Sequence, residues 1–227
     1  MSKARVSAKK ALTGMIFPKY STLLDKVNWN ARWLETVRKA SSVPQFQYRR
    51  ELHSFVNETR FNGGADPVDY LEFGVYQGES LRMWANLNKN PSSRLFGFDS
   101  FIGLPEDWTA KKRKGSYSAS GHLPAIEDDR VELVIGWFQN SLPGFLSTYK
   151  PQHRLVIHND SDLFSSTLYC LAVLNPIIRP GTIIIFDEFD AVLDEFRALE
   201  SYLSSFMRTS KIIGATSDFC QTAVEID

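Results

Sequence analysis

The chain alternates short apolar runs with amphipathic segments, an order typical of a sheet with helices between its strands. Residues 68–73 form a continuous apolar run, and glycines and a helical pattern reaching Leu87 follow it. Runs of this length predict buried parallel strands. Later runs of the same kind lie at residues 94–99, 130–136, 154–159 and 182–186. The last two runs, KIIGATSD and CQTAVEID, are joined by a short link and predict an antiparallel hairpin. We therefore predict a doubly wound, Rossmann-like α/β fold with a seven-stranded sheet and a C-terminal antiparallel hairpin.

The first 64 residues do not fit this alternation, so we predict two parts, residues 1–64 and 65–227. Residues 1–18 read as a basic arm with Lys3, Arg5, Lys9 and Lys10, and their interrupted apolar run makes a poor signal peptide. Residues 19–60 show helical patterns, which have no place inside a standard doubly wound sheet. Two roles stay open for these helices: a cap over a ligand cleft, or a contact between copies of the chain in a homo-oligomer.

Charge and cysteine content narrow the function. The chain has 26 basic and 26 acidic residues, and this balance does not favour a nucleic-acid partner. No run approaches the ~20 apolar residues of a membrane-spanning helix, so a cytoplasmic protein is expected. Cys170 and Cys220 lie in apolar patterns, which predicts core residues rather than a disulfide or a zinc site.

The turn after the first predicted strand carries candidate ligand-binding residues. Glu72 lies near the end of the strand, and Gly74, Gly78 and Ser80 lead into the helix. A strand, a glycine turn and a helix place backbone N–H groups where a polar ligand can reach them. The G-x-x-x-G spacing differs from the G-x-G-x-x-G of dinucleotide binders, and a carboxylate just before the turn suits a ligand with a positive charge.

Acidic residues also follow the other predicted strands, where open α/β sheets bind ligands. Asp99 ends the second strand, in the position where nucleotide folds hold ribose hydroxyls. Asp160 and Asp187 follow neighbouring strands, and Glu188 follows Asp187. Gathered carboxylates repel, and a shared Mg²⁺, Ca²⁺ or Mn²⁺ ion relieves this repulsion. The alternative is that the acids cap the next helices, a role that we expect for Asp162 and Asp190.

Residues 101–129 form a long segment without a clear periodic pattern. Loops of this length are usually functional or disordered, and the aromatic residues here favour a lid over the substrate. His122 lies in this segment and reaches a substrate only when a lid closes. His158 lies two residues before Asp160, on the same face of its strand, and is either a base or a core residue.

Five segments in order resemble the macrocin O-methyltransferase family over residues 70–196: EFGVYQGES, FGFDSFIGLPEDW, GWFQNSLP, HNDSDLFSSTLYCL and PGTIIIFDEF. The resemblance implies a class I methyltransferase that uses S-adenosyl-L-methionine (SAM) and a divalent cation, usually Mg²⁺, to methylate a hydroxyl of a sugar or glycosylated small molecule. The metal ligands that it implies are Asp160, Asp187 and Glu188, although the family has Asp where this chain has Glu188. The SAM contacts that it implies are Glu72, Gly74, Gly78, Ser80, Asp99, Ser100, Gly136, Trp137 and Phe138.

The catalytic candidates are therefore Asp160, His158 and His122. Two other functions stay open. One is a non-catalytic module that binds SAM or a nucleotide in the same cleft. The other is an NAD-dependent oxidoreductase, which the glycine spacing disfavours.

Overall fold

The computed structural model describes residues 23–227. The predicted basic arm, with Lys3, Arg5, Lys9 and Lys10, lies outside the described residues. The chain divides into two compact units, one ending at Ser41 and one running from Ser42 to Asp227. The described part of the first unit is a helix over residues 23–39.

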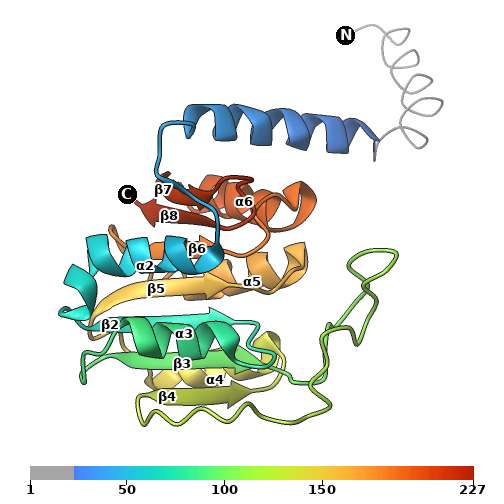
Figure 1. The fold of residues 1–227 in the computed structure, drawn as a ribbon. Helices are drawn as coiled ribbons and strands as arrows, with labels where there is room; N and C mark the ends of the chain where they lie inside the picture. The colour runs from blue at the N-terminus through green and yellow to red at the C-terminus, as the bar shows by residue number, and fades with distance from the viewer. Residues whose placement is uncertain (1–22) are drawn as a thin grey trace, which may run out of the picture. The chain divides into compact units, whose positions relative to one another are not determined.

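An eight-stranded sheet forms the centre of the second unit (Figure 1). The strand order is β1-β7-β8-β6-β5-β2-β3-β4. The strands are β1 (Gln45–Phe46), β2 (Val68–Phe73), β3 (Arg94–Asp99), β4 (Val131–Ile135), β5 (Arg154–Asn159), β6 (Ile183–Phe186), β7 (Ser210–Thr216) and β8 (Thr222–Ile226). The seven predicted strands are confirmed. The eighth, β1, was not predicted because a two-residue strand has no detectable period.

Strand direction also agrees with the prediction. β8 runs antiparallel to both β6 and β7, and the other neighbouring strands are parallel. All residues of β2 and β6 are buried. Burial on both faces explains why β6 reads as a continuous apolar run and why β2 does not alternate, although β2 also buries Asp69 and Glu72.

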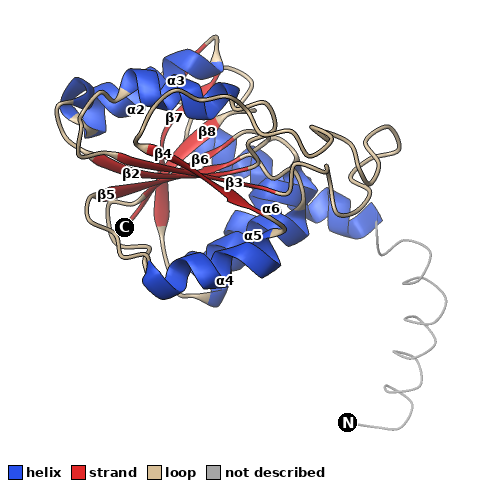
Figure 2. Cartoon of the chain, turned by 90° about the horizontal axis from the view of Figure 1, so that it is seen from below, coloured by secondary structure: helices blue, strands red, loops and turns tan. Residues whose placement is uncertain are grey.

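Helices cover both faces of the sheet (Figure 2). One layer contains α2 (Arg49–Arg60) and α3 (Glu79–Leu87). The other contains α4 (Phe138–Thr148), α5 (Phe164–Leu174) and α6 (Arg197–Ser205). A π-helical turn, η2 (Val192–Phe196), leads into α6. The parallel strands thus point their carboxyl ends to one edge, where the loops into α3, α4 and α5 meet.

The sequence analysis grouped α2 with the N-terminal region, whereas in the structure it belongs to the same compact unit as the sheet. Its residues Leu52 and Val56 are fully buried in the hydrophobic core beside Trp84 of α3. The preceding strand, β1, pairs with β7. The apolar stripe of α2 is therefore part of the domain core, and the division of the chain falls after Ser41.

Two expectations about composition can be compared with the structure. Cys170 and Cys220 are free thiols, as predicted, and Cys170 is buried. Among residues 23–227, no helix has both the length and the apolar character needed to cross a membrane.

Candidate functional site

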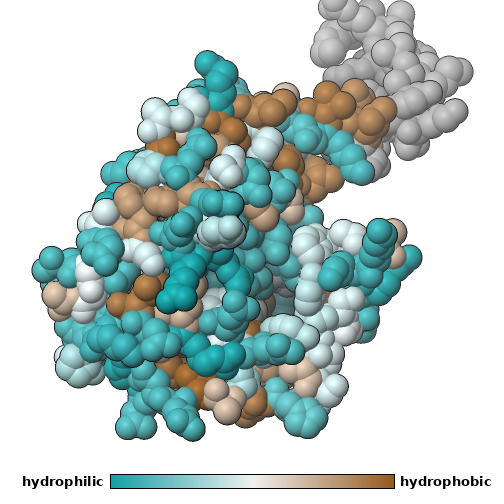
Figure 3. Space-filling model, viewed as in Figure 1, coloured by the Kyte–Doolittle hydropathy of each residue, from teal (hydrophilic) through white to brown (hydrophobic). Residues whose placement is uncertain are grey.

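A cavity of about 300 Å³ lies at the carboxyl ends of the parallel strands. This volume is within the range of small-molecule sites. The space-filling view shows a hollow at this end of the sheet, bordered by hydrophilic side chains (Figure 3). Nine predicted site residues line the cavity: Gly74, Ser80, Asp99, Ser100, Trp137, Phe138, Asp160, Asp187 and Glu188.

Gly74 allows two strand ends to approach closely. Its φ of +100° is a conformation that side-chain-bearing residues rarely adopt, and an added Cβ would lie 1.7 Å from the carbonyl oxygen of Asp160. The turn after β2 therefore packs directly on the residue that follows β5. A glycine is required at this position by both conformation and space.

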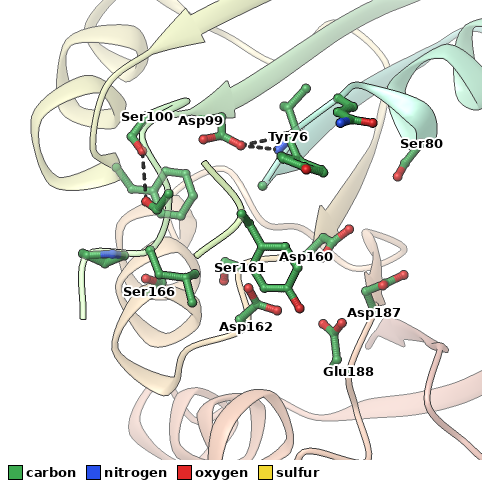
Figure 4. Close-up of a pocket in the computed structure, with 18 of the residues that line it drawn as sticks. Tyr76, Ser80, Asp99, Ser100, Asp160, Ser161, Asp162, Ser166, Asp187 and Glu188 are labelled. Atoms are coloured by element: carbon green, nitrogen blue, oxygen red, sulfur yellow. Dashed lines mark hydrogen bonds between the residues drawn. The ribbon is translucent and has the colours of Figure 1, made fainter. Parts of the chain in front are cut away.

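Asp99 holds the same turn from the other side. Its Oδ2 accepts hydrogen bonds from the backbone N–H groups of Val75 and Tyr76, both at 2.8 Å. Its Oδ1 accepts one from the N–H of Phe101 at 2.7 Å. Figure 4 shows Asp99 and Tyr76 in this arrangement. A single carboxylate at the end of β3 thus fixes the glycine turn and the start of the 101–129 segment, and it still borders the cavity.

Three other predicted cofactor contacts, Glu72, Gly78 and Gly136, do not line the cavity. Glu72 is fully buried, and the hydroxyl of Tyr70 donates a hydrogen bond to its Oε2 at 2.6 Å. Its other oxygen, Oε1, has no hydrogen-bond partner within residues 23–227. Gly78 is the left-handed N-cap of α3. The strand-end rule identified the correct edge of the sheet, but it did not indicate which side chains point into the cavity.

The two histidines considered as bases lie outside the cavity lining. His158 is fully buried, with Nδ1 2.8 Å from the Tyr70 hydroxyl and Nε2 3.9 Å from Asp187 Oδ1. Burial lowers the pKa of His158, but the neighbouring carboxylates of Asp187 and Glu72 outweigh this effect and raise the pKa to about 10. His122 is exposed, and its Nδ1 lies 3.0 Å from the carbonyl oxygen of Ala119.

Four carboxylates gather at one side of the cavity, across from Asp99 and Ser100 (Figure 4). Oxygens of Asp160, Asp162 and Glu188 lie within 4.8 Å of one another, as do ligand atoms of His158, Asp160 and Asp187. Asp160 belongs to both groups. The three predicted metal ligands therefore do not form one group with each other. Instead, Asp160 pairs with Asp187 on one side and with Glu188 on the other.

Crowding shifts the ionisation of these acids. Burial, together with the charge of Glu195, raises the pKa of Glu188 to about 11, and burial with the charge of Asp187 raises that of Asp162 to about 7. Burial and Asp187 also raise the pKa of Asp160. Burial acts in the same direction on Asp187, but His158 and Arg49 outweigh it and lower the Asp187 pKa to about 2. Burial and mutual repulsion thus make Asp160, Asp162 and Glu188 hold a proton more readily than free carboxylates do, while Asp187 stays ionised beside its cationic partners.

The residues present fit a hard divalent cation. Carboxylate oxygens are the ligands that Mg²⁺ and Ca²⁺ prefer. Two buried atoms beside the cluster, Oε2 of Glu188 and Nε2 of His158, have no hydrogen-bond partner among the described residues. Buried polar atoms are normally satisfied, so each unsatisfied one needs an explanation. A bound cation provides one for the Glu188 oxygen.

The alternative that these acids are helix caps is not supported. The N-cap of α5 is Leu163, and that of η2 is Ala191, and neither cap makes a side-chain hydrogen bond. The prediction that Asp162 and Asp190 act as caps is wrong for this reason. Asp162 instead turns into the cavity, with a φ of +61°.

The repulsion predicted among these acids is partly neutralised in the structure by an arginine side chain. Arg49, the first residue of α2, places Nη1 3.3 Å from Asp187 Oδ1 and 3.9 Å from Asp160 Oδ2. Arg49 is 138 residues from Asp187 in the sequence. No local motif indicates this contact, because it depends on how α2 packs on the sheet.

Glu195 was also missed. It lies in η2, is fully buried, and accepts hydrogen bonds from Asn159 Nδ2 at 2.7 Å and from the backbone N–H of Glu188 at 2.9 Å. Glu195 thus ties together the ends of β5 and β6, which carry the acids. The feature of the structure that indicates a site role for Glu195 is the π-helical turn η2, because such turns are frequent at functional sites.

The segment between β3 and β4 contains turns and bends but no helix or strand. Gly103, Leu104, Pro105 and Tyr117 from this segment line the cavity. Farther along it, Trp108 Nε1 donates a hydrogen bond to Asp194 Oδ2 of η2 at 3.0 Å. This hydrogen bond therefore attaches the segment between β3 and β4 to η2.

Comparison with known proteins agrees with this site. A curated relative from Streptomyces olivaceus, 8-demethyl-8-(2,3-dimethoxy-alpha-L-rhamnosyl)-tetracenomycin-C 4'-O-methyltransferase, is 31% identical over 144 residues. The match covers 54% of this chain and 53% of that protein, so the chain spans about half the length of this relative.

Solved structures share the fold. The calicheamicin methyltransferase CalS11 has 21% identity and a TM-score of 0.60, with 78% of this chain and 80% of that chain covered. The O-methyltransferase NovP has 22% identity and a TM-score of 0.61, with 78% of each chain covered. An O-methyltransferase from Bacillus cereus, solved in complex with SAH, has 17% identity and a TM-score of 0.52, covering 97% and 96%. Residues 71–189 match the methyltransferase domain family. The matched range includes the glycine turn and all four carboxylates, and the chain belongs to this family.

Proposed function

We propose that the protein transfers the methyl group of SAM to a hydroxyl of a sugar or glycosylated small molecule, with the assistance of a divalent cation. One observation carries the proposal: a single cavity has the glycine turn and Asp99 on one side and the carboxylates of Asp160, Asp162, Asp187 and Glu188 on the other. The first side suits an adenosine cofactor and the second suits a cation with an acceptor hydroxyl.

Cofactor binding is assigned to the side of the cavity near β2, β3 and β4. Asp99 is placed to accept hydrogen bonds from ribose hydroxyls, beside Ser100. Trp137 and Phe138, which follow β4, offer flat apolar surfaces to an adenine ring. The sulfonium group of SAM carries a positive charge, which the acids across the cavity favour.

The acceptor proposal rests on the relatives. The curated relative is named as a methyltransferase of a rhamnosyl-bearing compound, at the 4'-oxygen. The cavity of this chain combines polar and aromatic lining, including Tyr76, Tyr117 and Gln139. Such a lining suits a sugar, because hydroxyls bond to the polar groups while the ring packs on the aromatic faces.

The cation is assigned to Asp160, Asp187 and Glu188. Their ligand atoms do not all lie within 4.8 Å of one another, so the Asp187 and Glu188 side chains would turn toward Asp160 to share one ion. A divalent cation bound there lowers the pKa of a coordinated hydroxyl and so makes its oxygen a better nucleophile. The protein's own contribution is alignment of donor and acceptor, an effect worth up to ~7–11 kcal/mol in well-oriented systems. Gly74, Asp99 and Glu195 supply the rigidity, since each fixes a segment that lines the cavity.

We also propose that the N-terminal helix mediates contact between copies of the chain. Four apolar residues of residues 23–39 are at least half exposed: Leu23, Leu24, Val27 and Leu34. Exposed apolar side chains grouped on one helix are typical of an interaction surface. Light scattering on the full chain and on a variant with Leu24, Val27 and Leu34 changed to Ser tests this, and equal masses for the two proteins exclude it.

The decisive experiment for the activity is incubation with SAM and a panel of glycosides, sugars and phenols, followed by mass spectrometry. The proposal expects a mass gain of one methyl group on a hydroxyl-bearing sugar, together with SAH. Binding of SAH without turnover on any member of the panel favours the non-catalytic alternative. Tight NAD binding without SAH binding contradicts the proposal.

A further inference from the structure

Arg49 occupies an unusual position among the cavity residues. Of the described residues that line the cavity, it is the one with a Lys or Arg side chain. Its guanidinium contacts Asp187 at 3.3 Å and lies 3.9 Å from Asp160, through the same nitrogen, Nη1. The two carboxylates that it faces are two of the three proposed cation ligands.

A guanidinium and a divalent cation cannot both stay close to these two acids without mutual repulsion. Like charges at such separations repel strongly in a partly buried site, where water screens them weakly. The Arg49 side chain is 28% exposed, compared with 25% for Asp160 and 10% for Asp187. The guanidinium ends a long side chain with several rotatable bonds, whereas the two carboxylates are on short side chains held by the ends of β5 and β6, so the guanidinium is the partner that can move farther.

A third acid, Glu79, lies where a displaced Arg49 guanidinium would arrive. Nη2 of Arg49 is 3.7 Å from Oε1 of Glu79, whose side chain is 85% exposed at the rim of the cavity. A separate shallow hollow, lined by Tyr48, Arg49, Arg50, Glu79, Met83 and Asn86, continues from this point. The side chain can thus leave the buried acids by rotating its outer bonds, and it keeps one anionic partner.

We propose that Arg49 is an internal counter-ion that competes with the divalent cation for Asp160 and Asp187. Without the cation, the guanidinium neutralises the acids and keeps the cavity formed. When the cation binds, Arg49 moves toward Glu79. The measured cation affinity then reports the replacement of the Arg49 guanidinium by the cation. This inference rests on the proposed metal site.

Isothermal calorimetry of Mn²⁺ and Mg²⁺ binding to the full chain tests this without any measurement of turnover. The variants are Arg49→Met, which keeps an unbranched flexible side chain and removes the charge, and Arg50→Met as the neighbouring control. Arg50 is exposed and does not line the cavity that holds the acids. We expect Arg49→Met to bind the cation at least tenfold more tightly than wild type, and Arg50→Met to bind as wild type does.

A double-mutant cycle with Glu79→Gln gives an independent measurement. In wild type, loss of Glu79 removes the second partner of Arg49, so cation affinity should fall about two- to fivefold, the range of an exposed ion pair. In the Arg49→Met background the same change should have a smaller effect, because no guanidinium needs a new partner. Arg49→Lys replaces Arg49→Met if melting curves show that the Met variant does not fold, and its shorter, non-forked side chain should also tighten cation binding.

The outcomes separate the two proposals. Cation binding that is equal in wild type and Arg49→Met, or weaker in the variant, overturns the role of Arg49 and leaves the metal site in place. Binding to neither protein overturns the metal site and this inference together. Asp160→Asn in the Arg49→Met background should abolish the tight binding, and tight binding that survives this change also overturns the inference.

Discussion

Glu72 of β2 and His158 of β5 are paired in register, and both side chains are completely buried. His158 Nδ1 lies 3.4 Å from Glu72 Oε2, and the Tyr70 hydroxyl contacts both residues. This buried polar group lies beneath the cavity, and through His158 it reaches Asp187. Tyr70, Glu72 and His158 therefore form a buried polar network, in which Glu72 Oε1 and His158 Nε2 have no hydrogen-bond partner among the described residues.

Tyr70→Phe tests the strength of this network. The change removes the donor to Glu72 and leaves a buried carboxylate less satisfied, at a cost of about 1–3 kcal/mol in the free energy of unfolding. Urea denaturation measures the difference. Tyr169→Phe is the control, because its hydroxyl makes only a long 3.5 Å contact with the Gln139 carbonyl. Equal losses in the two variants would show that the network adds nothing specific.

Gly74→Ala should be among the most damaging single substitutions in the chain. The new Cβ meets the carbonyl of Asp160 at 1.7 Å, and alanine disfavours the φ of +100°. We expect a loss above about 3 kcal/mol in the free energy of unfolding. Gly144→Ala in α4 is the matched control, since its Cβ meets nothing within 4 Å and alanine favours helix. Thermal melting that ranks the two variants equally contradicts the packing argument.

Asp99→Asn should weaken SAH binding more than it weakens the fold. Asparagine offers one acceptor oxygen in place of two. The three backbone N–H groups that bond to Asp99 and the ribose hydroxyls would then compete for that single oxygen. A lost charged hydrogen bond costs about 1–3 kcal/mol, which corresponds to roughly a 10- to 100-fold weaker affinity. Calorimetry with SAH measures this, and Asp66→Asn, an exposed acid outside the cavity lining, serves as the control. Unchanged affinity in Asp99→Asn removes it from the cofactor site.

Trp108→Phe should loosen the 101–129 segment. The change removes the hydrogen bond from Trp108 Nε1 to Asp194 but keeps an aromatic ring. We expect limited proteolysis to cut this segment several times faster in the variant, because local opening becomes easier. Addition of SAM and acceptor should slow cleavage in the wild type if the segment closes over a substrate. Equal cleavage with and without ligands makes the segment a plain surface loop.

Removal of the cation should affect turnover more than cofactor binding. We expect EDTA to abolish methyl transfer, and added Mg²⁺ to restore it, while SAH affinity changes little. Asp160→Asn and Asp187→Asn should likewise lower turnover by at least 100-fold, in the range that a lost ionic stabilisation of the reacting group produces. Asp190→Asn, exposed and outside the cavity lining, is the comparison. Full activity in EDTA refutes a role for the cation.

The sequence by itself determined where seven of the eight strands lie along the chain and that the last two are antiparallel. A strand buried on both faces needs a continuous apolar run, and a short link forces an antiparallel pair, so both features can be read from neighbouring residues. The same local rules placed Gly74, Asp99, Asp160 and Asp187 at one edge of the sheet. All four line the cavity.

Only the tertiary structure decided which side chains enter the cavity and what neutralises them. Glu72 and His158 lie on strands that end at the site, yet both point into the core, because the packing of α2 and α3 covers that face. Arg49 reaches Asp187 because α2 packs against the sheet. Glu195 reaches the backbone of Glu188 because the π-helical turn changes the direction in which its side chain points. The contact of Arg49 with Asp187 spans 138 residues and that of Glu195 with Asn159 spans 36, so both depend on helix packing, which local periodicity does not encode.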